Sequence, residues 1–142
     1  LYRRGKDGWQ PAGSIPRPPQ PQEPAEEEGF VPHGFGRRIV LDGPRAFVSD
    51  TWSKPIENGY SSVYNGVFVL IQRDGGWEQE KRYVHAVRQA MFGADFEVRG
   101  TRLFIDSMNE NAVYVFERRE GEWQGPTRVP KDEPAPSDAK EN

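Results

Sequence analysis

The sequence predicts an all-β fold built from β-propeller blades or a similar array, and three observations lead to this prediction. Apolar residues fall in short runs rich in valine, isoleucine, phenylalanine and tyrosine, without a long helical period. A pattern of aromatic-rich strand, glycine turn and tryptophan occurs three times, ending at Trp9, Trp77 and Trp123. Self-similarity of roughly 40 to 50 residues is typical of repeat architectures.

A second marker precedes two of the three tryptophans. Phe35-Gly36 comes before Trp77, and Phe92-Gly93 comes before Trp123. We expect each phenylalanine to be a core residue at the start of a blade's inner strand. The glycine that follows permits close approach of another backbone.

The three tryptophans allow two interpretations. They could be sugar-stacking platforms, as in some propeller lectins. Because Trp9, Trp77 and Trp123 recur together with their turns, packing between neighbouring blades is the favoured interpretation.

Composition excludes several classes of protein. With 35% hydrophobic and 12% aromatic residues the 142-residue chain should fold, although 13 prolines and 15 glycines indicate that its order is uneven. The net charge of -3 comes from 19 basic and 22 acidic residues mixed along the chain, so nucleic-acid binding is not favoured. The absence of cysteine excludes disulfides. No apolar run approaches the roughly 20 residues that a membrane helix needs.

Five segments are expected along the chain. They are the last strands of a partial blade (1–15), an exposed proline- and glutamate-rich linker (16–29), two complete blades (30–84 and 85–129) and a disordered tail (130–142). In the first complete blade, strands are expected at 38–41, 46–49, 66–71 and 77–84, with a long loop over 50–65. In the second, strands are expected at 96–98, 103–106, 113–117 and 123–129.

The long loop is the most individual segment and the first candidate for binding. Trp52, Tyr60 and Tyr64 stand among small polar residues, a mixture that is common on recognition surfaces. These aromatic residues could equally fold back over the edge of the blade. Asp50 and Asp106 are expected at equivalent positions after a second strand, lining one rim. A shared turn-capping function explains them more simply than paired acid–base chemistry.

No motif supports an enzymatic function. The two histidines, His33 and His85, lie in different units, and neither has a metal-ligand spacing nearby. No G-x-S-x-G, H-E-x-x-H or phosphate-binding glycine loop occurs. The sequence therefore predicts no catalytic residue, metal or cofactor.

At this point the two complete units resemble a known family. Phe35-Gly36 followed by 39–49, and Phe92-Gly93 followed by 96–106 and 113–116, resemble the FG-GAP repeat, the blade unit of integrin α-chain β-propellers. The resemblance is best to bacterial and secreted versions and covers about residues 30–129, with half a unit at 1–15. This sequence departs from the family pattern in two respects. The Gly-Ala-Pro triplet of the repeat is replaced at 49–51 and 106–108, and the aspartate-rich calcium loop is missing.

The resemblance implies a non-enzymatic binding or adhesion module of a secreted, periplasmic or cell-surface protein, recognising a protein or glycan through rim loops. A lectin-like propeller assembled from several short chains is one alternative, and a scaffold propeller in a larger complex is another. A propeller needs at least about four blades, which two complete units and a half do not supply. Other blades are therefore expected as partners, on further polypeptide or on symmetric copies.

Overall fold

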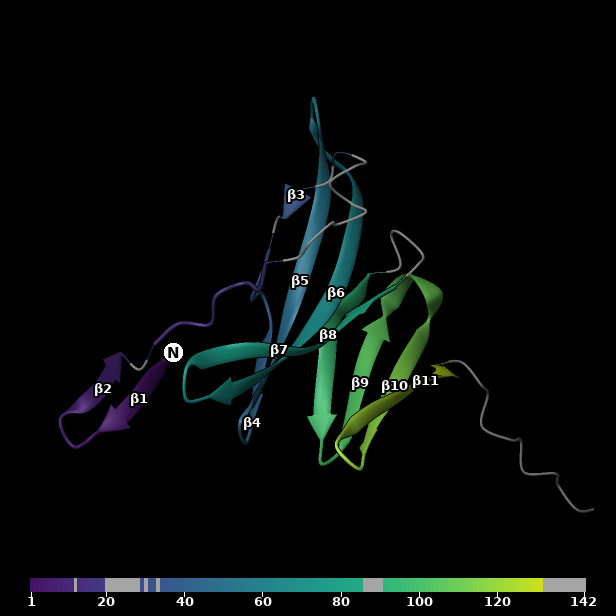
Figure 1. Ribbon diagram of the computed structural model, residues 1–142. Helices are drawn as coiled ribbons and strands as arrows, with labels where there is room; N and C mark the ends of the chain where they lie inside the picture. Colours follow the sequence, from purple (N-terminus) through teal and green to yellow (C-terminus); the bar gives the residue numbers. More distant parts are fainter. Residues whose placement is uncertain (12, 20–28, 30, 33, 86–90, 132–142) are drawn as a thin grey trace, which may run out of the picture.

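The fold consists of antiparallel β-sheets, as the sequence predicts. The computed structural model describes residues 1–11, 13–19, 29, 31–32, 34–85 and 91–131. Within these residues the chain forms three sheets (Figure 1). The strands are β1 (Tyr2–Gly5), β2 (Gly8–Pro11), β3 (Val31–Pro32), β4 (Ile39–Asp42), β5 (Arg45–Ile56), β6 (Gly59–Arg73), β7 (Gly76–Val84), β8 (Phe92–Arg99), β9 (Arg102–Ser107), β10 (Ala112–Arg119) and β11 (Glu122–Pro130), with a short 3-10 turn η1 (Met108–Glu110).

Two of the sheets each contain a four-stranded meander of strands consecutive along the chain, β4-β5-β6-β7 in the five-stranded middle sheet and β8-β9-β10-β11 in the C-terminal sheet. In the middle sheet, β3 and β4 share one edge of β5, and β6 and β7 follow. In the C-terminal sheet the order is β8-β9-β10-β11. The third sheet is the N-terminal hairpin β1–β2. Described residues contain no helix long and apolar enough to cross a membrane.

The prediction of a long loop over 50–65 is wrong, because this segment forms a β-hairpin. β5 pairs with β6 from Arg45 opposite Ile71 to Ile56 opposite Gly59, with an irregularity near Pro55. The turn is Glu57-Asn58, and Gly59 follows with a φ of 135° that favours glycine. Asn-Gly between β-forming residues is a strong hairpin signal, which explains why the strands extend.

The central strands of the middle sheet, β5 and β6, are buried on both faces in their paired stretch 46–49 and 67–70. Phe47, Val67 and Val69 pack against the C-terminal sheet in one hydrophobic cluster, which also includes Tyr83. The alternate residues of the same strands form a second cluster on the opposite face, contacted by Ile15. That second cluster comprises Ala46, Val48, Phe68 and Leu70, with Phe35 and Trp77 packed against it.

The two four-stranded meanders correspond residue by residue. Ala46 pairs with Leu70, and Leu103 pairs with Phe116 in the same relation. Ala46 and Leu70 lie on the face of the middle sheet that points away from the C-terminal sheet, whereas Leu103 and Phe116 face the middle sheet. Equivalent faces therefore point in the same direction, and the sheets stack in the same sense rather than face to face.

The phenylalanine-glycine markers lie where this stacking begins. Phe92 is buried between the sheets, and Phe35 packs edge-on against Phe68 at 5.8 Å on the far face of the middle sheet. Gly36 and Gly93 have nearly the same φ, 82° and 80°. Phe92 is buried and begins β8, whereas Phe35 is half-buried, lies before β4 and packs against the second cluster.

The expected linker and tail are described only in part. Residues 16–19 run along the middle sheet, and Arg17 is fixed there by an ion pair with Asp50, so this stretch is not a solvated spacer. The rest of the linker except Gly29, and the tail from 132 onward, lie outside the described residues.

Candidate functional site

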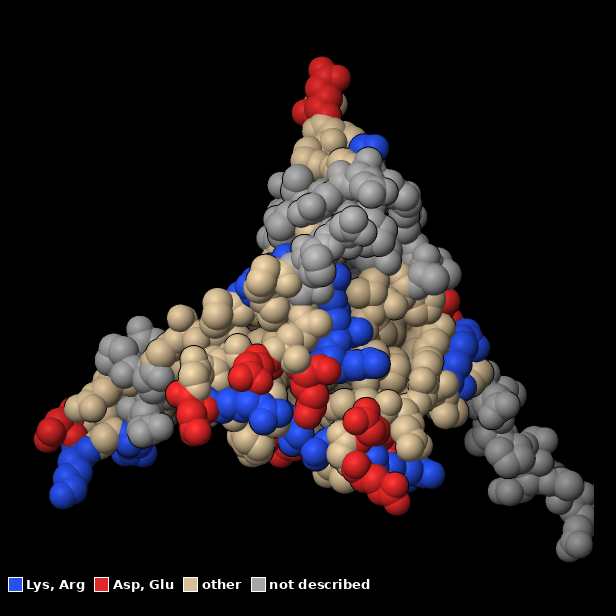
Figure 2. Space-filling model, in the orientation of Figure 1, with Lys and Arg blue, Asp and Glu red and all other residues tan. Residues whose placement is uncertain are grey.

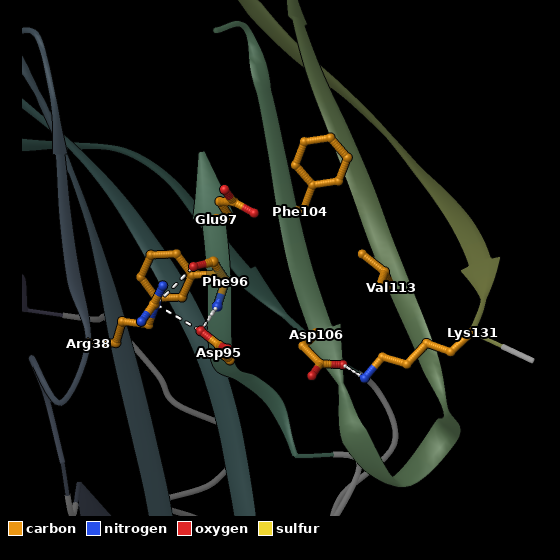
Figure 3. A pocket seen from close by; sticks show the side chains of 8 residues that line it. All are labelled: Arg38, Asp95, Phe96, Glu97, Phe104, Asp106, Val113 and Lys131. Carbon is orange, nitrogen blue, oxygen red and sulfur yellow. Dashed lines mark hydrogen bonds and ion pairs between the residues drawn. The ribbon is translucent and has the colours of Figure 1, made fainter. Parts of the chain in front are cut away.

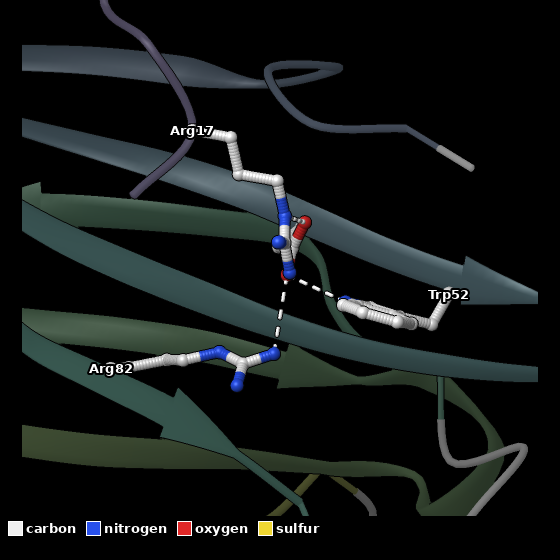
Figure 4. Close-up of polar contacts among 4 residues, drawn as sticks. Arg17, Trp52 and Arg82 are labelled. Atoms are coloured by element: carbon white, nitrogen blue, oxygen red, sulfur yellow. Dashed lines mark hydrogen bonds and ion pairs between the residues drawn. The ribbon is translucent and has the colours of Figure 1, made fainter. Parts of the chain in front are cut away.

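The Asp50 carboxylate lies at the centre of a buried ion cluster on the far face of the middle sheet. Arg17 donates two hydrogen bonds to it, at 3.0 and 2.9 Å, and Trp52 donates a third through Nε1 at 2.8 Å. Arg82 approaches at 3.3 Å from β7 (Figure 4). The Arg17 guanidinium also stacks on the Trp52 ring at 4.6 Å. These contacts fix residues 13–19 against the sheet.

Asp50 and Trp52 are therefore not rim residues. Both side chains are 1% exposed, and the carboxylate oxygens accept hydrogen bonds from within the protein. Because alternate residues of a strand face the same side, the two residues follow Ala46 and Val48 onto the apolar face. The expectation that they lie on an exposed loop is wrong.

Asp50 and Asp106 are not equivalent. Asp106 pairs with Val113 as Ser49 pairs with Val67, so the counterpart of Asp50 is Ser107. A shift of one residue moves a side chain to the opposite face of a strand. Asp106 accordingly faces away from the middle sheet, where it forms an ion pair with Lys131 at 2.6 Å.

The other two aromatic candidates, Tyr60 and Tyr64, lie on the strand that pairs with β5. Tyr60 and Tyr64 belong to β6, opposite Pro55 and Trp52, and their side chains lie outside the described part of the chain.

The three tryptophans are not in equivalent environments. Trp77 and Trp123 pack against the two hydrophobic clusters, as expected for structural markers. Trp9 is 70% exposed on the N-terminal hairpin.

The ends of the two meanders differ in shape. At the lower end, four two-residue turns close the strands tightly, for example Asp74-Gly75 between Arg73 and Gly76. At the upper end the β5–β6 hairpin projects beyond the neighbouring strands (Figure 1). Its tip carries exposed Ile56 and Glu57, and Met108 of η1 is also exposed at this end. We call this upper end the hairpin rim.

The hairpin rim also carries a polar network, which the sequence did not predict. His85 Nε2 is 2.9 Å from the Tyr114 hydroxyl and 3.1 Å from Glu110 Oε2. Ser107 donates to the same carboxylate oxygen at 2.6 Å. This hydrogen bond and the nearby His85 lower the pKa of Glu110, whereas burial raises the pKa of Tyr114. The local sequence signalled only a turn here, through Asn111, which adopts the left-handed backbone conformation before β10.

The network has no arrangement suited to nucleophilic catalysis. Ser107 is fully buried and donates to Glu110, and the carboxylate lies within 3.1 Å of His85. A serine nucleophile needs a base that accepts its proton and an open path to the substrate. The network therefore acts as a clamp that ties η1 to β10 and to the end of β7.

The outer face of the C-terminal sheet carries partly exposed apolar residues, and no other sheet of the described residues covers it. A hollow of about 270 Å³ lies on it, floored by Phe104 and Val113. Figure 3 shows Arg38 on one side, bonded to Asp95 and to the Phe96 carbonyl, and the Asp106–Lys131 pair on the other. A second hollow, of about 470 Å³, continues from Phe104 toward the lower end.

Charge does not define a binding surface. Figure 2 shows basic and acidic side chains of both signs scattered over the visible face, with acidic atoms at the tip of the β5–β6 hairpin. In the part of the chain that the structure describes, no three His, Cys, Asp or Glu side chains group as a metal site would require. The candidate sites are therefore the hairpin rim and the outer face of the C-terminal sheet.

Comparison with known proteins adds no family. No protein-family model matches the chain, and no solved structure matches it. The resemblance to FG-GAP repeats thus stays a prediction from the residues.

Proposed function

We propose that this chain is a non-enzymatic binding module of FG-GAP-type β-propeller blades, belonging to a secreted, periplasmic or cell-surface protein. It recognises a protein or glycan partner through the hairpin rim. The observation that carries this proposal is the same-sense stacking of two corresponding four-stranded meanders.

Stacking in one sense distinguishes successive blades from the halves of a closed sandwich. In a two-sheet sandwich, each sheet buries one face and exposes the other to water. Here the central strands of the middle sheet are buried on both faces, and the C-terminal sheet buries the face equivalent to the far face of the middle sheet. A unit that is apolar on both faces needs a covering on each side, as the units of a repeat array do. In this chain the C-terminal sheet covers one side of the middle sheet, and Ile15 and Arg17 lie on the other.

The difference between the two ends supports recognition through the hairpin rim. The lower turns have two residues each and do not project beyond the strands they join. The hairpin rim offers a projecting tip with an exposed isoleucine and an acidic neighbour, and Met108 of the C-terminal sheet's η1 turn is also exposed. Loops that extend beyond a rigid scaffold commonly carry binding.

A lectin-like function is the second candidate, because one specific observation favours it. Trp9 exposes 70% of its surface, and an exposed indole is a suitable stacking platform for a sugar ring. This alternative predicts that sugar binding depends on Trp9 and not on the hairpin tip.

The test uses a printed glycan array and a panel of immobilised extracellular-matrix proteins as probes. Ile56→Ala and Glu57→Ala should each weaken binding by about tenfold or more, as removal of an interface hot spot does. The matched control is Asp74→Ala, an exposed residue in a lower turn, which should bind as the wild type does. Binding that is lost in Trp9→Ala and kept in the tip variants would favour the lectin function. No binding to any probe, or equal binding by all variants, would contradict both.

A further inference from the structure

We propose that the outer face of the C-terminal sheet binds the N-terminal hairpin of a second copy of this chain, with Trp9 of that copy filling the lower hollow. The inference rests on the repeat correspondence that also supports the proposed function. It is independent of the partner bound at the hairpin rim.

The acceptor face repeats an apolar set that is buried elsewhere in the molecule. On the middle sheet, the C-terminal sheet covers Phe47, Val67, Val69 and Tyr83. Strand pairing gives their counterparts on the outer face of the C-terminal sheet, which are Phe104, Val113, Val115 and Val129. Val67 and Val69 have no exposed surface, whereas Val129 is 46% exposed. The second set is thus placed to receive another sheet of the same kind.

Trp123 shows what occupies the equivalent place on the middle sheet. Its ring meets Phe47 edge-on at 5.9 Å, and its Nε1 donates to Glu80 at 3.0 Å. Glu80 is itself held by Arg45 at 2.7 Å. An indole between a phenylalanine and an arginine–glutamate pair is therefore the arrangement that seals one sheet against the next.

The lower hollow of the C-terminal sheet has the same chemistry without the indole. Its lining includes Phe104, Val115 and Val129 together with Arg102 and Glu117. Arg102 contacts Glu117 at 3.3 Å, so a phenylalanine again lies beside an arginine–glutamate pair. The Glu117 carboxylate can accept a hydrogen bond from an incoming indole N–H, as the Glu80 carboxylate does from Trp123.

The N-terminal hairpin is the matching donor. Trp9 pairs with Arg4 across a two-residue turn, in the register that joins Trp77 to Gln72 and Trp123 to Arg118. In the part of the chain that the structure describes, this sheet has two strands, and an isolated two-stranded hairpin is marginally stable in water. Packing its exposed tryptophan on a preformed apolar face stabilises it.

The occupant is a second copy, because the hairpin of the same chain cannot reach this face. Figure 1 shows the N-terminal hairpin and the C-terminal sheet on opposite sides of the middle sheet. Residues 13–19 connect the hairpin to the molecule and are fixed to the middle sheet by Ile15 and Arg17. The contact therefore joins two different surfaces, and it is a heterologous interface.

The test measures association of the full chain by sedimentation velocity, from about 1 µM to about 300 µM, where weak interfaces become visible. The wild type should form dimers and larger species as concentration rises. Trp9→Ala and Val129→Glu should each remain monomeric over this range. Ile56→Glu is the matched control for Val129→Glu, because Ile56 is 51% exposed on the hairpin tip, and it should associate as the wild type does.

Mixing the two deficient variants identifies the geometry. Trp9→Ala keeps an intact acceptor face and Val129→Glu keeps an intact hairpin, so their mixture should form a dimer that does not grow further. Circular dichroism melting of each variant shows whether it has kept its fold. A wild type that stays monomeric, association that survives Trp9→Ala, or a mixture that stays monomeric while both variants are folded would overturn the proposal.

The test is separable from that of the proposed function. Monomeric Trp9→Ala still carries the complete hairpin rim, so it should bind the same glycan or protein probes as the wild type at equal chain concentration on a monovalent sensor. Loss of self-association with retained probe binding supports both proposals, and self-association without any probe binding rejects the rim function alone.

Discussion

Gly93→Ala tests a close approach between the two large sheets. A Cβ at position 93 would lie 2.9 Å from the Gly66 carbonyl oxygen and 2.9 Å from Val67 Cγ2. The first of these is backbone in the centre of β6 and cannot move aside without disturbing the ladder. Gly93 also has a φ of 80°, in the region that favours glycine.

Gly36 provides a control that separates these two effects. Its φ of 82° is nearly the same, but a Cβ there would meet only Ile39 Cδ1, at 3.6 Å. Gly36→Ala should therefore lower the free energy of unfolding by the backbone term alone, about 1–2 kcal/mol. Gly93→Ala adds the overpacking of the sheet interface, about 1–3 kcal/mol more.

Equilibrium unfolding in urea, followed by tryptophan fluorescence and far-ultraviolet circular dichroism, measures the difference. With an ordinary denaturant dependence, the midpoint of Gly93→Ala should be roughly 1 M lower than that of Gly36→Ala. Measurement near 1 µM keeps self-association from contributing. Equal midpoints for the two variants would show that the sheets do not approach each other at Gly93, and would refute the stacking argument.

The remaining predictions concern buried polar groups. Asp50→Asn should lower the free energy of unfolding by about 3 kcal/mol in urea titrations, because the arginines on the far face lose their buried counter-charge; an unchanged midpoint would mean that the cluster is not formed. Trp123→Ala should lower it by about 3–5 kcal/mol, because the indole lies in the core between the sheets; a small loss would place this ring outside the core. The hydrogen bond from Arg45 lowers the pKa of Glu80, so the stability due to this carboxylate is complete above the ordinary glutamate pKa and is lost as pH falls through the folded value. Wild type should therefore lose more free energy of unfolding between about pH 6 and pH 3 than Glu80→Gln does, and parallel curves for the two proteins would rule this out.

Local signals in the sequence were sufficient for most of the fold. Short apolar runs rich in β-branched and aromatic residues, separated by glycine turns, predicted the strands of both meanders. The same reasoning failed at 50–65, where β5 and β6 continue as one long hairpin that accommodates Pro55 at an irregularity in the pairing. The Asn58-Gly59 pair was the signal that could have corrected it.

The candidate sites were less predictable because they depend on contacts between distant residues. Arg17 and Asp50 are 33 residues apart and meet only after the meander has formed. His85 and Tyr114 come from different sheets and likewise share no local pattern. The placement of Asp106 failed for a different reason, since an error of one residue in register reverses the face of a strand.

Side chains of very different volume lie along the contact between the two large sheets. At Gly66 and Gly93 the sheets are separated by little more than glycine backbone. Elsewhere Phe92 and Phe96 fill the space between them, and the indole of Trp123 stands between Phe47 and Tyr83. Because these side chains set the local spacing, substitutions that change their volume would tilt one sheet against the next and alter the curvature of any longer assembly of these units.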